Sequence, residues 1–213
     1  MVETAGLEHE QEMWSRGLKR VAGVDEAGRG PLAGPVAAAA VILDPGRLGE
    51  LPGLTDSKKL SPSRREALFP LIQSASLAWA LGWASEEEIE RHNILRASLL
   101  AMTRALEGLA VRPQAALVDG PHAPQAGLPC RPLVRGDALS LSIAAASVLA
   151  KVSRDRLMER HHQRYPLYGF DRHKGYGTAQ HWKALREHGP CPIHRASFLR
   201  KGLAPLLDQG GAA

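Results

Sequence analysis

The sequence has little cysteine and no long apolar run. Its two cysteines, Cys130 and Cys191, are too few for a disulfide framework, and its N-terminus lacks the charged start, apolar core and cleavage site of a secretory signal. We therefore expect a cytoplasmic protein. The most apolar window, Leu32–Leu43, is interrupted by glycine and proline and falls short of the ~20 residues that span a bilayer, so we expect no membrane role.

Signatures of several enzyme classes are also missing. No histidine stands in a recognisable motif with a serine or cysteine nucleophile, and no Gly-Lys-Ser/Thr phosphate loop occurs. The segment Gly28–Ala33 fits a loose dinucleotide fingerprint, but Pro31 suits a turn and an extended strand follows where a helix is needed. The spacing of His188, Cys191 and His194 is interleaved with prolines and lacks an evident fourth zinc ligand. We expect none of these chemistries.

The 213 residues carry 27 Lys and Arg against 22 Asp and Glu, a net charge of +5. This excess favours a polyanionic partner such as nucleic acid, although a solvated basic surface explains the charge equally well. The length suits one compact α/β domain, so we expect a single, monomeric domain over residues 1–213. Its expected parts are an N-terminal helix at about 1–18, a core at about 19–165, a helical extension at about 166–208 and a tail at 209–213.

Apolar periodicity predicts alternating strands and helices. The predicted strands are Lys19–Glu26, Gly34–Leu43, Leu77–Ala84, Gln114–Val118 and Cys130–Val134. The predicted helices are Leu7–Leu18, Pro62–Ser74 capped by Ser61, a helix from Ser85 to about Leu109 that Asn93 interrupts, Ser140–Gln163, Ala179–Glu187 and Ser197–Leu207. Because a strand, a helical crossover and a further strand usually make a right-handed parallel unit, Asp119 is expected at the same sheet edge as Asp25 and Glu26.

Four acidic residues follow predicted strands or precede a helix: Asp25, Glu26, Asp119 and Asp137. At about 4 Å and an effective dielectric of about 20, two like charges repel by roughly 4 kcal/mol, so carboxylates gathered at one edge need cations. A two-metal phosphodiesterase requires such a set to clamp two ions about 3.5 to 4 Å apart, and oxygen ligands suit Mg²⁺ or Mn²⁺. Asp119 alone is explained by an Asp-Gly turn, but the four together favour a metal site.

Six motifs, in order along the chain, resemble those of bacterial ribonuclease HII. They are Gly23–Val36 (GVDEAGRGPLAGPV), Asp56–Leu60 (DSKKL), Val118–Gly120 (VDG), Gly136–Asp137 (GD), Ser142–Lys151 (SIAAASVLAK) and His173–Thr178 (HKGYGT). The resemblance runs from about Arg20 to Leu203 and implies a ribonuclease H-like fold, a mixed β-sheet flanked by helices with a small C-terminal helical extension. It also implies that the four acids hold two Mg²⁺ or Mn²⁺ ions.

The same resemblance implies hydrolysis of the RNA strand of RNA/DNA hybrids. It further implies incision 5′ to a single ribonucleotide embedded in duplex DNA, leaving a 5′-phosphate and a 3′-hydroxyl. In this family the turn at Gly28, Arg29 and Gly30 contacts the ribose 2′-hydroxyl, and its glycines allow a close backbone approach. Tyr176 resembles the family's residue that packs on the following deoxynucleotide.

Several lysines extend the expected nucleic-acid surface. Given the resemblance, Lys58 or Lys59 is expected to contact the phosphate backbone. Lys151 is expected to pair with Asp137 or Asp155, and Asp155 is expected to form an ion pair and not to bind metal. These residues would add affinity without reading sequence.

Three alternatives remain open at this point. Ribonuclease HIII shares the motifs but has a further N-terminal domain, for which the roughly twenty residues before the first predicted strand are too few. A non-catalytic nucleic-acid-binding module would leave the four acids unexplained. A Holliday-junction-type nuclease on the same fold would leave the Gly-Arg-Gly turn and Tyr176 without a role.

Overall fold

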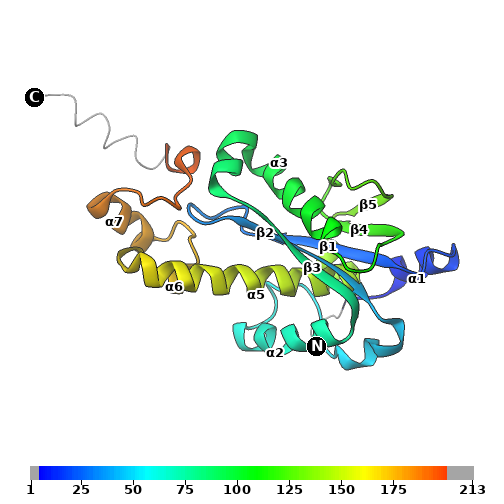
Figure 1. Cartoon of the computed structure of the whole chain (residues 1–213). Helices are drawn as coiled ribbons and strands as arrows, with labels where there is room; N and C mark the ends of the chain where they lie inside the picture. The colour runs from blue at the N-terminus through cyan, green and yellow to red at the C-terminus, as the bar shows by residue number, and fades with distance from the viewer. Residues whose placement is uncertain (1–4, 201–213) are drawn as a thin grey trace, which may run out of the picture.

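The computed structural model describes residues 5–200 and contains a mixed five-stranded sheet of order β3-β2-β1-β4-β5 (Figure 1). The strands are β1 (Val21–Ala27), β2 (Val36–Leu43), β3 (Ser76–Ala84), β4 (Ala115–Asp119) and β5 (Cys130–Leu133). β1 pairs with β2 and β2 pairs with β3 in antiparallel orientation. β1 pairs with β4 and β4 pairs with β5 in parallel orientation. The predicted mixed sheet and its five strands are therefore confirmed.

Helices cover both faces of this sheet. The α-helices are α1 (Glu8–Ser15), α2 (Pro62–Ser74), α3 (Glu86–Glu107), α4 (Gly136–Leu139), α5 (Leu141–Arg164), α6 (Phe170–His173) and α7 (Ala179–His188), with 3-10 turns η1 (Pro45–Glu50) and η2 (Pro166–Tyr168). Figure 1 shows α3 on one face and α2 and α5 on the other, with α6 and α7 beyond the end of α5. The predicted C-terminal helices are thus present up to α7, whereas most of the predicted Ser197–Leu207 helix and the 209–213 tail lie outside the described residues.

The helix boundaries follow the local capping chemistry. Ser61 caps α2 by accepting a hydrogen bond from the backbone N–H of Arg64, as predicted. Ser85 and Glu88 form a capping box at the start of α3. Asn93 interrupts α3 with a left-handed φ of 69°, and its side chain accepts hydrogen bonds that restart the helix. Side chains readable in the sequence therefore set these boundaries.

Strand β2 is buried along its whole length because both faces of the sheet are covered. Ala39 and Val41 pack in the core formed with α2 and α5, whereas Ala38 and Ala40 pack in the core formed with α3. Successive side chains of a strand point to opposite faces, which accounts for this division. Four consecutive alanines keep both helical layers close to the sheet.

Two glycines allow helices to approach the strands even more closely. A Cβ at Gly23 would overlap the backbone carbonyl of Ser142 on α5, and a Cβ at Gly82 would overlap the carbonyl of Ala101 on α3. Neither glycine has a left-handed φ, so space and not backbone conformation requires them. Among residues 5–200, no helix has both the length and the apolarity needed to cross a bilayer.

We predict that Gly23→Ala lowers the free energy of unfolding by about 3 kcal/mol, because strand β1 and helix α5 must move apart to admit the methyl group. Urea unfolding followed by circular dichroism measures this loss. The matched control is Gly49→Ala, since a Cβ there meets no atom within 4 Å and should change stability little. Equal stabilities of the two variants would contradict the close packing of β1 on α5.

Candidate active site

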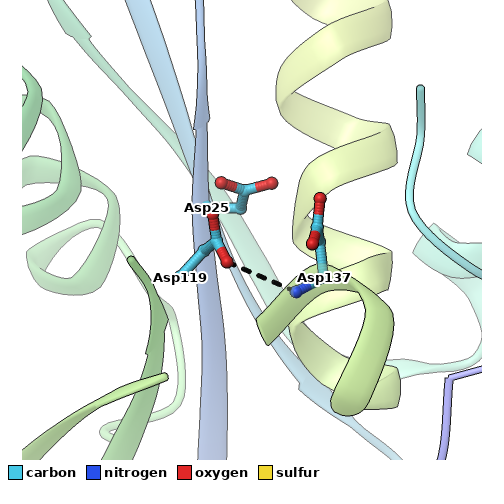
Figure 2. Close-up of side chains that lie close together, drawn as sticks. All are labelled: Asp25, Asp119 and Asp137. Carbon is cyan, nitrogen blue, oxygen red and sulfur yellow. Dashed lines mark hydrogen bonds between the residues drawn. The ribbon is translucent and has the colours of Figure 1, made fainter. Parts of the chain in front are cut away.

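The strand register brings two of the predicted acids side by side. Val24 of β1 pairs with Val118 of β4 in parallel register, so the next residues, Asp25 and Asp119, leave the sheet at neighbouring positions. Asp137 reaches them from the short helix α4, and its backbone N–H donates to Asp119 Oδ1 at 3.4 Å (Figure 2). One carboxylate oxygen from each of the three residues lies within 4.8 Å of the others. The predicted convergence of distant acids is confirmed for these three.

The three carboxylates lie where negative charge is costly. Asp25 and Asp137 are 4% and 5% exposed. Burial, and then the nearby Glu26 and Asp119 carboxylates, raises the pKa of Asp25 well above its ordinary value. Burial, followed by repulsion from Asp119 and Asp56, raises the pKa of Asp137 to about 6. The fold therefore holds these groups together against their mutual repulsion.

Glu26 lines the same cavity as Asp25, but its carboxylate is not part of this group of three. Side chains alternate along a strand, so the Cβ of Glu26 starts on the sheet face opposite to that of Asp25. Its Oε1 lies 3.4 Å from Arg29 Nη1. Burial raises the pKa of Glu26, although the Arg29 charge opposes that shift. Its role as a fourth metal ligand stays a prediction.

The two predicted phosphate-binding lysines lie in different places. Lys58 lines the carboxylate cavity, and its Nζ lies 3.7 Å from Asp137 Oδ2. Its side chain is 80% exposed, so it is free to reach toward a ligand at the mouth of the cavity. Lys59 instead lines an adjacent hollow that includes Arg135. The structure thus brings Lys58, but not Lys59, to the acidic site.

The cavity itself has a volume of about 200 Å³. Ser57 and Ser147 line it and share a hydrogen bond of 2.7 Å between their hydroxyl groups. Ser147 also donates a hydrogen bond that favours ionised Asp25, opposing part of the upward pKa shift caused by burial. The position of Ser57 in this cavity was not predicted, because nothing in the sequence around a single loop serine indicates which residues it contacts.

The other half of the cavity is formed by the Gly-Arg-Gly turn and an exposed aromatic ring. Gly28, Arg29, Gly30 and Tyr176 all line the cavity that contains Asp25. Tyr176 is 45% exposed, and a Cβ added at Gly30 would lie 3.5 Å from its Cε1. These predicted substrate residues, distant in the sequence, therefore lie next to one another.

The predicted Lys151 ion pair and His194, one of the residues set aside as zinc ligands, can also be placed. Lys151 pairs with Asp155 through an Nζ–Oδ1 contact of 2.7 Å, so Asp155 belongs to an ion pair as predicted. His194 Nε2 lies 3.0 Å from His181 Nε2, and no other group of three potential metal ligands occurs among residues 5–200. The structure therefore offers one candidate metal site within its described part.

The donor set of this site fits a divalent cation. Three carboxylates supply hard oxygen ligands, the kind preferred by Mg²⁺, Mn²⁺ and Ca²⁺. Among residues 5–200, the single ion pair made by Asp25, Asp119 and Asp137 is the one with the exposed Lys58. The uncompensated negative charge is the feature that a bound cation would neutralise.

Comparison with known proteins gives a consistent result. A family model described as Ribonuclease HII matches residues 22–201. The chain is 59% identical over 178 residues to a protein of Burkholderia thailandensis named Ribonuclease HII, covering 84% of this chain and 82% of that protein.

Solved structures agree with this assignment. The chain is similar to the ribonuclease H2 of Pyrococcus horikoshii, with a TM-score of 0.74 and 29% identity over 88% of this chain and 99% of that one. A likeness to a structure titled Bst-RNase HIII in complex with Mn²⁺ has a TM-score of 0.67 at 18% identity, over 90% of this chain and 72% of that one. The second likeness extends to the fold alone.

We predict that the buried acids make stability fall with rising pH when divalent cations are chelated. Between about pH 4 and pH 6 the folded chain keeps the Asp137 proton that the unfolded chain has released, so raising the pH favours unfolding. Asp137→Asn removes this cost and should raise the free energy of unfolding by about 1 to 3 kcal/mol at pH 7, and by little at pH 4. Urea unfolding in chelator at both pH values measures the difference.

The matched control is Asp155→Asn. Its carboxylate pairs with Lys151, so its loss should destabilise the protein at pH 7. If Asp137→Asn also destabilised the protein at pH 7, the repulsion between the clustered carboxylates would be refuted.

Proposed function

Because the chain belongs to the ribonuclease HII family, it is a hydrolase, an endonuclease of the ribonuclease H type, and we propose that it cuts the RNA strand of RNA/DNA hybrids. We further propose that it incises 5′ to single ribonucleotides embedded in duplex DNA, leaving a 5′-phosphate and a 3′-hydroxyl. One observation supports this most directly: Asp25, a buried member of the group of three carboxylates, lines one cavity together with a glycine-rich turn and an exposed tyrosine. A site of this kind combines hydrolysis with contact to a sugar.

The proposed cofactor is a pair of Mg²⁺ or Mn²⁺ ions. Asp25, Asp119 and Asp137 would hold them, with Glu26, which lines the same cavity as Asp25, as a fourth ligand. Divalent cations bound there would supply a Lewis acid that activates water and offsets charge developing at phosphorus. The chain's own contribution is to gather three carboxylates, two of them buried, in one place. Lys58, near Asp137 and largely exposed, would contact a backbone phosphate.

The proposed ribose contact rests on Gly30. This glycine has no left-handed φ, and an added Cβ would meet only Tyr176, at an ordinary contact distance. The protein itself therefore does not require glycine at this position. A close approach by a ligand does explain it, and a ribose 2′-hydroxyl is the group that distinguishes RNA from DNA. Tyr176 would pack against the neighbouring deoxynucleotide.

The proposed partners are RNA/DNA hybrids and ribonucleotide-containing duplex DNA, in keeping with the net charge of +5. A non-catalytic binding module is disfavoured, because burying acids together near a polyanion would weaken binding unless cations were bound. Action as a monomer in the cytoplasm stays a prediction.

A paired cleavage assay tests the proposal. With Mg²⁺ or Mn²⁺, the protein should nick a duplex that contains one ribonucleotide and leave the matching all-DNA duplex intact. Asp119→Asn should slow nicking by about 100-fold or more, because a cation ligand is lost. The control is Asp44→Asn, since Asp44 caps the distant turn η1. Equal cutting of both duplexes would refute ribose recognition, and full activity of Asp119→Asn would refute the metal site.

A second variant tests the sugar contact alone. We predict that Gly30→Ala lowers the nicking rate at least about tenfold while leaving the unfolding midpoint unchanged, because the new methyl group meets the ligand and not the protein. Thermal unfolding and single-turnover nicking measure the two effects. An unchanged nicking rate would place the ribose elsewhere.

A further inference from the structure

Two arginines are buried against the Gly28–Pro35 segment, which contains the Gly-Arg-Gly turn, and one of them, Arg154, also lines the cavity. Arg154 of α5 is 1% exposed and Arg195 is fully buried. Neither forms an ion pair with a carboxylate among residues 5–200. A buried charge costs several kcal/mol unless its polar groups are satisfied, so these side chains need another explanation.

Arg195 directs its donors at carbonyl groups of the turn. Its Nη2 donates to Gly28 O at 2.7 Å and to Gly34 O at 2.6 Å. Its Nη1 donates to Arg29 O at 3.1 Å, and its Nε donates to Gly34 O at 2.8 Å. The planar guanidinium of Arg195 therefore joins the Gly-Arg-Gly turn to Gly34, near the other end of the segment.

Arg154 bonds to further carbonyl groups of the same segment. Its Nη2 donates to Ala33 O and its Nε to Pro35 O, each at 3.0 Å. Its Nη1 donates to Lys174 O, also at 3.0 Å, two residues before Tyr176. The glycine at position 28 is part of this packing, because it has a φ of +101° and a Cβ there would overlap Arg154 Nε.

Backbone contacts join the same three segments. The N–H of Leu32 donates to Gly175 O at 2.8 Å, and the N–H of Gly34 donates to Ile193 O at 2.9 Å. The Gly28–Pro35 segment is thus fixed between the Tyr176 loop and the residues around Arg195.

The two arginines occupy the carbonyl groups of the segment but not the N–H groups of the turn. Five carbonyls of the segment, those of Gly28, Arg29, Ala33, Gly34 and Pro35, accept from the two arginines. By contrast, the N–H groups of Arg29 and Gly30 donate to no acceptor within the described part of the chain. Because the arginines fix the carbonyl groups of the turn, the N–H groups of Arg29 and Gly30 can donate to a ligand acceptor such as a sugar hydroxyl oxygen.

Holding both guanidinium groups here is costly. Burial, and then the like charge of Arg154, lowers the pKa of Arg195 to about 9. Stability alone is better served by apolar side chains than by two desolvated cations close together. The geometry they impose on the turn is the property that apolar residues would lack.

We propose that Arg154 and Arg195 are positioning residues that hold the Gly-Arg-Gly turn and Tyr176 in the arrangement that reads a ribose. The inference rests on the proposed function, since it assigns a role in recognising the same substrate. It assigns no contact between either arginine and the reacting atoms.

The test uses Arg195→Lys and Arg154→Lys in the full chain. Lysine keeps the positive charge but lacks the planar fork, so it cannot bond the same carbonyls together. The control is Arg104→Lys, because Arg104 also bonds a backbone carbonyl and a carboxylate, but on α3 and β3 away from the cavity. Each variant is assayed for kcat/KM on the single-ribonucleotide duplex and for inhibition by the all-DNA duplex.

We expect each site variant to lower kcat/KM at least about tenfold, with the inhibition constant of the all-DNA competitor within about twofold of the wild type. The all-DNA competitor lacks the 2′-hydroxyl, so its affinity does not include the proposed ribose contact. Arg104→Lys should leave both quantities within about twofold of the wild type.

The other outcomes overturn the proposal. Equal losses of kcat/KM and competitor affinity would indicate general damage to the site, and losses no larger than in Arg104→Lys would show that the turn needs neither arginine. Failure of both site variants to fold, judged by circular dichroism, would assign the arginines to the fold alone. Failure of the proposed function is seen separately, because the wild-type protein would then not nick the ribonucleotide duplex.

Discussion

The parallel pairing of β1 with β4 is the constraint on which the site depends. It sets Val24 beside Val118, and the residues that follow them must then carry their carboxylates into one place. Because strand pairing is fixed by many hydrogen bonds and by burial on both faces of the sheet, the two acids cannot move apart to relieve their repulsion. Asp137 completes the group from a helix that packs against the same edge. The cohesion of the sheet thus stabilises an arrangement that electrostatics opposes.

Groups of opposite charge are buried close to one turn. Asp25 and Glu26 line the cavity beside the Gly-Arg-Gly turn, and Arg154 and Arg195 are buried against carbonyl groups of the Gly28–Pro35 segment, with Arg154 lining the same cavity. These arginines do not neutralise the acids, because their donors are directed at backbone carbonyls. The carboxylates therefore remain available for cations, and the two guanidinium groups orient the peptide groups of the turn.

Much of this arrangement was predictable from the sequence. The strands, the caps at Ser61 and Ser85, and the convergence of Asp25 with Asp119 follow from periodicity and from the geometry of parallel strands. The different directions of Asp25 and Glu26 follow from strand alternation, although the prediction grouped them together.

Other features depend on tertiary contacts that leave no local pattern. Arg154 lies among surface-type residues in the sequence, and only the approach of three separate segments buries it. Lys58 and Lys59 are adjacent in one loop, yet they line different hollows. The small side chains of β2 illustrate a wider consequence: Ala39 sets how near α5 stands to one face of the sheet, and Ala38 and Ala40 set how near α3 stands to the other. A larger side chain deep in that strand would push a helix away from the sheet and so change the spacing of the carboxylates that we propose as metal ligands, which other elements carry.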